Sequence, residues 1–161
     1  MRWFFLYSFF STFVSNQNTQ TIMMNTIHSY WAYLVLAILI LALVNAIIGY
    51  TSKKDFKDKD LRISLFTLIT AHIQLLIGLG VYFSSPMYKS MKTSGVNEVN
   101  RMLAIEHPIM MLLAIVLITI GWSKHKKQTT DTGKFKTIVI FYGLALLLIL
   151  SRIPWNQWFT N

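Results

Sequence analysis

Four long apolar runs, separated by short polar segments, dominate the chain. They cover about residues 30–50, 63–83, 103–122 and 138–150. A transmembrane helix needs about 20 apolar residues, whereas a barrel strand needs about half that number and alternates in polarity. The fourth run reaches this length only if its helix extends over about residues 135–153. The pattern therefore predicts an all-α integral membrane protein, a bundle of four transmembrane helices.

Composition agrees with a chain that lies in lipid. Apolar residues make up 54% of the chain and charged residues 13%, and the mean hydropathy is +0.49. An ordinary soluble domain carries about 25% charged residues. The absence of cysteine excludes disulfides, iron–sulfur clusters and covalently attached c-type heme. No phosphate loop, nucleophile–base pair or zinc-protease motif is present, so the sequence does not predict an enzyme acting on its own.

Positive charge is concentrated in two of the connecting segments. The net charge of +9 would suggest nucleic-acid binding in a soluble protein, but here most basic residues flank predicted spans, so we expect no nucleic-acid partner. Segments 51–62 and 123–137 carry five lysines or arginines each, whereas segment 84–102 carries three. Because cytoplasmic loops are enriched in lysine and arginine, we expect the first two segments inside and both termini outside.

Residues 1–23 precede the first predicted span. Arg2, followed by an apolar stretch over residues 3–14, resembles a short signal-peptide core and is too short for a fifth span. The alternative, which we favour, is an upstream start codon, with the functional chain beginning at Met23 or Met24. Both interpretations leave residues 24–161 as one four-helix domain.

Histidines in the spans are the first candidates for chemistry, because an ionisable side chain in a bilayer is costly. His28 lies at the outer end of the first span, His72 near the middle of the second and His107 in the outer part of the third. His125 falls in the basic segment 123–137, where we expect a solvated side chain.

Two imidazoles on different helices of a bundle can hold the iron of a b-type heme from both faces. At 1.5 Å per residue, His28, His107 and His72 lie about 32 Å, about 24 Å and about 15 Å from the inner boundary. Depth alone therefore does not select the partner of His107. The ordinary alternatives are an interfacial His28 and a His72 that hydrogen-bonds across helices.

Three charged residues lie near the proposed outer boundary. We expect Glu106 to face the outer water, although it could also bond an imidazole N–H or carry a proton. Arg101 and Arg152 would pair with heme propionates if heme lies there, and would otherwise be interface anchors. In the second span, Gln74 and Gly78 lie at helical spacing, and we expect Gln74 to face inward in a structural helix–helix contact.

These segments resemble a family of small bacterial four-helix membrane proteins labelled cytochrome B. The resemblance is carried by HSYWAYLVLAILI, SLFTLITAHIQLLIGLGVYFSSP, IEHPIMMLLAIVLITIGWSKHKK and SRIPW, and covers about residues 24–155. It implies heme b and a multi-pass protein of the bacterial inner membrane.

The chain is also distantly similar to one half of heme A synthase, a four-helix bundle whose first and third helices carry heme-ligating histidines. This likeness implies that His28 and His107 are the axial pair and that His72 is not. Only one half is present, and a glutamate shortly before the first-helix histidine is missing, so the likeness does not imply catalysis.

Together these observations predict a heme b protein that transfers electrons near the outer face, with a quinol or a partner subunit. The alternative, from another class, is a cofactor-free structural or assembly subunit of a larger membrane complex. The oligomeric state stays open.

Overall fold

The computed structural model describes residues 2–85, 88 and 101–155, with side chains described from residue 19 onward. Its helices are α1 (Arg2–Thr51), α2 (Asp58–Ser84), α5 (His107–His125) and α6 (Asp131–Ser151), with a π-helical turn, η1 (Met102–Glu106), leading into α5. The described part of the chain contains no strand, and four of its helical segments are long and apolar enough to cross a membrane. The prediction of an all-α protein with four spanning helices is confirmed.

The helices begin and end beyond the apolar runs, because their terminal turns carry polar residues. The fourth span reaches 21 residues since α6 begins at Asp131, several residues before the apolar run. Thr130 caps this start: its side-chain oxygen accepts a hydrogen bond from the backbone N–H of Gly133 at 3.1 Å. A cap of this kind stabilises a polar first turn that hydropathy alone does not reveal.

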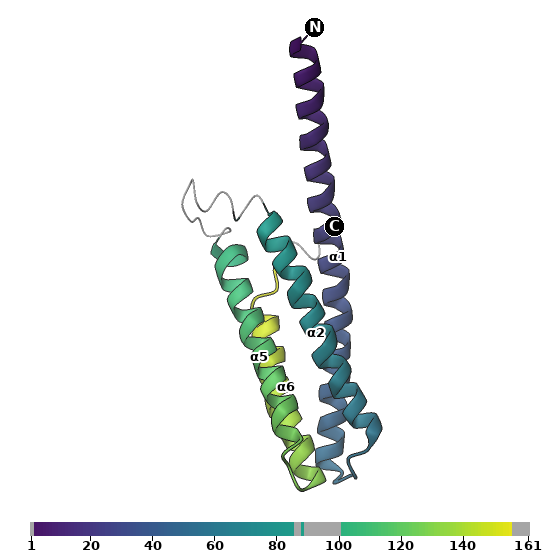
Figure 1. Ribbon diagram of the computed structural model, residues 1–161. Helices are drawn as coiled ribbons and strands as arrows, with labels where there is room; N and C mark the ends of the chain where they lie inside the picture. The colour runs from purple at the N-terminus through teal and green to yellow at the C-terminus, as the bar shows by residue number, and fades with distance from the viewer. Residues whose placement is uncertain (1, 86–87, 89–100, 156–161) are drawn as a thin grey trace.

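Helix α1 is one continuous helix of 50 residues. Its N-terminal part projects beyond the end of the bundle (Figure 1), while its candidate membrane span covers Thr19–Thr51. Residues 1–23, predicted to be an extension outside the four-helix domain, therefore continue the first helix without a break from Arg2 onward. The start-codon and signal-peptide interpretations of this segment stay predictions.

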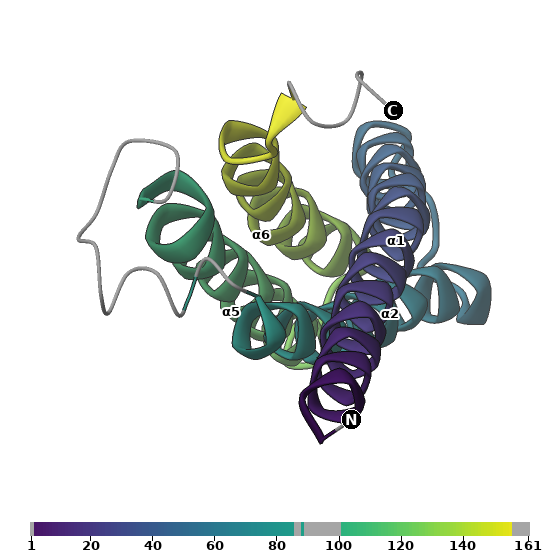
Figure 2. The ribbon, with the colours of Figure 1, turned by 90° about the horizontal axis from the view of Figure 1, so that it is seen from above.

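Viewed along the bundle, the helices follow one another in the order α1, α2, α5, α6, so α1 and α5 lie diagonally opposite (Figure 2). The buried core contains Leu39 from α1, Ile118 from α5 and Tyr142 from α6. The Tyr142 hydroxyl donates a 2.9 Å hydrogen bond to the carbonyl oxygen of Ser64 on α2. Because hydrocarbon offers no alternative partner, such a bond fixes how two helices meet.

Helices α1, α5 and α6 draw together at the end that carries the two short basic loops (Figure 1). Gly49 of α1 lies directly against the ring of Phe135 on α6, where a Cβ atom would overlap the ring. Gly121 of α5 similarly approaches Phe141, whose Cβ would lie 2.6 Å from an added Cβ. At both positions an aromatic residue of α6 occupies the space that a Cβ atom would need, so glycine allows the close contact between helices.

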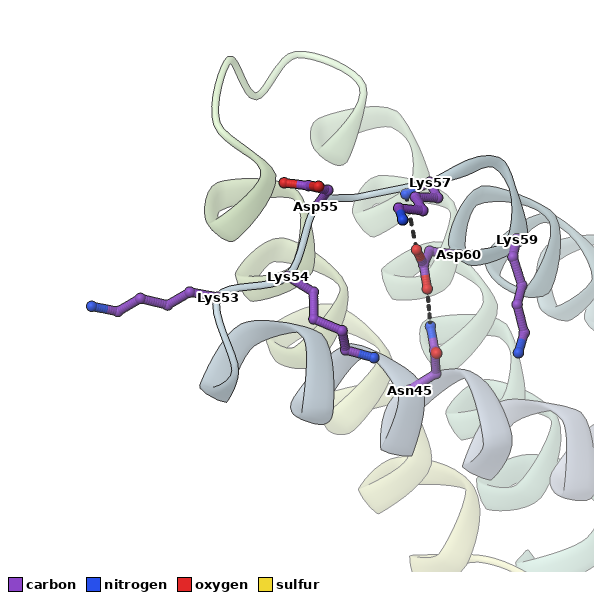
Figure 3. Close-up of a pocket in the computed structure, with 7 residues that line it drawn as sticks. All are labelled: Asn45, Lys53, Lys54, Asp55, Lys57, Lys59 and Asp60. Atoms are coloured by element: carbon purple, nitrogen blue, oxygen red, sulfur yellow. Dashed lines mark hydrogen bonds between the residues drawn. The ribbon is translucent and has the colours of Figure 1, made fainter.

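The loop between α1 and α2 is tied to the bundle by a buried carboxylate. Asp60 accepts hydrogen bonds from the backbone N–H of Lys57 at 2.9 Å and from the side-chain amide of Asn45 at 2.7 Å (Figure 3). Lys53, with φ of 50°, supplies the left-handed turn that ends α1. These residues border a pocket of about 410 Å³ that is lined by four lysines.

The two basic loops lie at the same end of the bundle, as the charge pattern requires, but their side of the membrane stays a prediction. The chain lacks cysteine, so single cysteines at Lys53, Lys127 and Lys89 can be labelled without background. We expect a membrane-impermeant thiol reagent added to intact cells to label only the Lys89 variant. Lys89 itself lies outside the described residues. Labelling at Lys53 or Lys127 in intact cells would show that the orientation is reversed.

Candidate cofactor-binding site

His28 and His107 face each other across the diagonal of the bundle. Their ring centroids are 6.3 Å apart and their planes are inclined by 76°. Counting residues along straight helices places them about 8 Å apart in depth. Helices α1 and α5 are inclined to one another (Figure 2), so the depth difference counted along straight helices is removed and the two rings meet.

His107 is the first residue of α5 and directly follows the π-helical turn, and Pro108 comes next in the chain. Its Nδ1 lies 2.8 Å from the backbone carbonyl oxygen of Arg152, at the end of α6. A carbonyl oxygen can only accept, so Nδ1 carries the proton. In the neutral ring the lone pair is then on Nε2, which is the arrangement found in metal-ligating histidines.

His28 is held by Gln74 of α2. The side-chain nitrogen of Gln74 lies 3.2 Å from Nδ1 of His28 and 3.1 Å from the carbonyl oxygen of the same residue. In this orientation the amide donates to Nδ1, and the proton of the neutral ring is on Nε2. The prediction that Gln74 points into the bundle is confirmed, and its contact is with a candidate ligand.

If the oxygen and nitrogen of the Gln74 amide exchange places, the proton of His28 moves to the other ring nitrogen. Its Oε1 is buried and has no hydrogen-bond partner among the described residues. Turning the amide would let Oε1 accept from an Nδ1–H, which frees the Nε2 lone pair of His28 but gives up the bond to the backbone carbonyl. Gln74 therefore determines which nitrogen of His28 can bind a metal.

Gly78, one turn beyond Gln74, provides the space for the His28 ring. A Cβ built on Gly78 would lie 3.2 Å from Cε1 and 3.6 Å from Nδ1 of His28. The sequence predicts this glutamine-to-glycine spacing to be a structural helix–helix contact. In the structure it also makes room for the ring of His28, a candidate ligand.

Glu106 joins two arginines beside His107. Its carboxylate oxygens lie 3.0 Å from Nε of Arg101 and 3.1 Å from Nε of Arg152. The expectation that Glu106 merely faces the outer water is wrong, because its side chain is 30% exposed and paired on both sides. The two arginines are already partnered, so their role toward heme propionates stays a prediction. Sequence reasoning considered the three residues singly and missed their association.

His72 lies outside this arrangement. Its side chain is exposed on α2, and Nδ1 lies 2.7 Å from the carbonyl oxygen of Leu68 in the same helix. The buried face of α2 is formed by other residues, among them Thr67 and Ala71. The expected alternative, a hydrogen bond from His72 to another helix, is therefore wrong, because His72 bonds within its own helix.

His125, predicted to be a solvated loop residue, is only 1% exposed. This prediction is wrong, because α5 continues to His125 and the α1–α2 loop packs over it. The ring lies between Phe56, with centroids 5.7 Å apart, and Trp122, with centroids 4.7 Å apart. The signal in the sequence was Trp122, three residues earlier and thus on the same helix face.

The described residues contain no group of three or more histidine, cysteine or acidic side chains that could hold a bare metal ion. A facing pair of imidazoles suits instead a metal that brings its own equatorial ligands, as the iron of a porphyrin does. The chain is a multi-pass helical membrane protein with this histidine pair between diagonal helices. Comparison with protein-family models, curated proteins and solved structures finds no match. The likeness to the cytochrome B family and to heme A synthase therefore stays a prediction.

Proposed function

We propose that the protein binds heme b between His28 and His107 and transfers electrons at that end of the bundle. The observation that carries this proposal is the 6.3 Å separation of the two ring centroids. Bonds of about 2.0–2.1 Å from imidazole nitrogens to a metal, the lengths known for zinc, separate two opposed ring centres by roughly 6 Å. The residues present thus fit an axial pair.

The surroundings of the pair support the same proposal. The Arg152 carbonyl fixes the His107 proton on Nδ1. Gln74 would do the same for His28 with its amide turned, so that Oε1 accepts from Nδ1–H and the Nε2 lone pair is free. Such partners orient ligand imidazoles and are as much part of a metal site as the ligands. Arg101 and Arg152 would hold the propionates, in competition with Glu106. When bound, heme exchanges single electrons.

The position of the pair suggests its redox partners. Among the described residues, both histidines lie far along their helices from the two basic loops, at the opposite end of the bundle. If those loops are cytoplasmic, electrons pass near the outer face of a bacterial inner membrane. A membrane quinol or the subunit of a respiratory complex would be accessible there.

An absorption spectrum of the purified full chain tests the proposal. Oxidised and dithionite-reduced samples should show the bands of a low-spin, bis-histidine b-type heme. A sample purified without heme should acquire the same spectrum when hemin is added. If the folded protein does not bind hemin, the proposal is contradicted, and a cofactor-free structural or assembly subunit is favoured.

A further inference from the structure

A second polar pocket lies at the basic end of the bundle, away from the histidine pair. It has a volume of about 280 Å³ and is formed by the α1–α2 loop, the start of α2, the end of α5 and the start of α6. Lys57, Lys126 and Lys134 line it, and His125 contributes to its inner wall. Four segments that are far apart in sequence therefore bring cationic groups together.

His125 is the unusual member of this set. Its ring is buried between two aromatic side chains, yet Nδ1 makes no well-aligned hydrogen bond among the described residues, although the backbone of Gly121 and Trp122 lies close to the ring. A buried polar nitrogen without a well-aligned partner is destabilising. Such a group in the wall of a pocket suggests that a ligand supplies the missing partner.

The charges of the pocket favour an anion. Lys134 is paired with Asp131 at 2.9 Å, and Asp58 also lines the pocket, so two carboxylates offset part of the positive charge. Lys57 and Lys126 are exposed, and the ammonium of Lys126 lies 4.4 Å from the centroid of the Trp122 ring. The side chain of Lys126 thus lies over Trp122, one of the two rings that flank His125, and also lines the pocket that an anion would enter.

The depth of the pocket indicates where this anion comes from. The candidate spans of α2 and α5 begin or end at Asp58 and His125, which line this pocket. The span of α6 begins at Asp131, which pairs with Lys134 of the pocket wall. The pocket therefore lies where a bilayer places lipid headgroups. Basic pockets between transmembrane helices at this level bind the headgroups of anionic lipids.

We propose that this pocket binds a phosphate group, provided by the headgroup of an anionic phospholipid. Lys57 and Lys126 neutralise the phosphate, and Nδ1–H of His125 donates a hydrogen bond to one of its oxygens. Because the ring is 1% exposed, the side chains around it must shift for this contact to form. Free phosphate shares the same chemistry, and the experiment separates the two sources.

The test uses the full chain, delipidated in detergent and titrated with phosphatidylglycerol, phosphatidylcholine or inorganic phosphate. Affinity is measured by native mass spectrometry, and histidine-selective ¹⁵N NMR follows Nδ1 of His125. We expect tight binding of phosphatidylglycerol only, with a shift of the His125 signal. Lys126→Gln and His125→Phe should each weaken it about tenfold, since each removes one charged or charge-assisted contact. His125→Asn, which keeps a donor near Nδ1, should restore part of the affinity.

Lys127→Gln is the matched control, because Lys127 is exposed in the same loop and does not line the pocket. It should change the affinity less than about twofold, as expected for an exposed charge. Equal losses in the Lys126 and Lys127 variants would reduce the effect to general charge attraction and overturn the proposal. An unchanged His125 signal at saturating lipid would overturn it as well. Binding of inorganic phosphate without preference for the lipid would assign the pocket to a soluble phosphate and overturn the lipid source.

Discussion

Replacing either His28 or His107 by alanine should abolish the low-spin bis-histidine heme spectrum, whereas His72→Ala should leave it unchanged. Each histidine of the facing pair supplies one axial ligand, and a heme with a single imidazole no longer has this spectrum. His72 is exposed and hydrogen-bonded within α2, so it takes no part. Absorption spectra of the three purified variants, oxidised and reduced, measure the effect.

His72→Ala serves as the control for the removal of an imidazole from a membrane span. Helix content and monodispersity of all three variants should match the parent chain, because neither His28 nor His107 belongs to the most deeply buried core. Loss of the spectrum in the His72 and His107 variants, but not in the His28 variant, would identify a different axial pair. Unchanged spectra in both His28→Ala and His107→Ala would refute the site.

Hydropathy predicted the fold well because in lipid an apolar run of sufficient length can hardly be anything but a helix. The four runs lie within α1, α2, the continuous segment of η1 and α5, and α6. Hydropathy did not locate the ends of the helices, because polar caps extend the helices beyond the apolar region. Examples are Thr130 at α6 and Lys57 with Asp60 at α2. It also could not reveal the π-helical turn Met102–Glu106, whose residues are compatible with an α-helix.

The site was predictable only in part, because single residues were identified but their contacts were not. Residue counting along straight helices left the partner of His107 open, and the inclination of α1 and α5 brings His28 to it. The sequence places Glu106 in water because its two arginine partners lie far apart in the chain, before η1 and at the end of α6. It places His125 in solvent because the burial of His125 depends on Phe56, about 70 residues earlier in the chain.

The room for His28 depends on Gly78, so enlarging this residue should disrupt the site. A Cβ at position 78 would already lie 3.2 Å from Cε1 of His28, and the two methyl groups of valine would extend further into the space of the ring. Loss of a group that positions a ligand typically costs about 10- to 100-fold in metal affinity. We expect Gly78→Ala to weaken hemin binding by about tenfold, at the lower end of that range, and Gly78→Val by at least about 100-fold. Absorbance titration with hemin measures both.

Gly143→Ala and Gly143→Val are the matched controls, since Gly143 also lies within a spanning helix. A Cβ at this position would meet only Leu43, at an ordinary contact distance of 3.8 Å. The same substitutions there change helix propensity and side-chain volume but leave His28 untouched, so hemin affinity should be preserved. If the Gly143 and Gly78 variants lose affinity equally, the effect arises from the bundle as a whole. If neither Gly78 variant loses affinity, His28 does not need the space beside Gly78, and its assignment as an axial ligand fails.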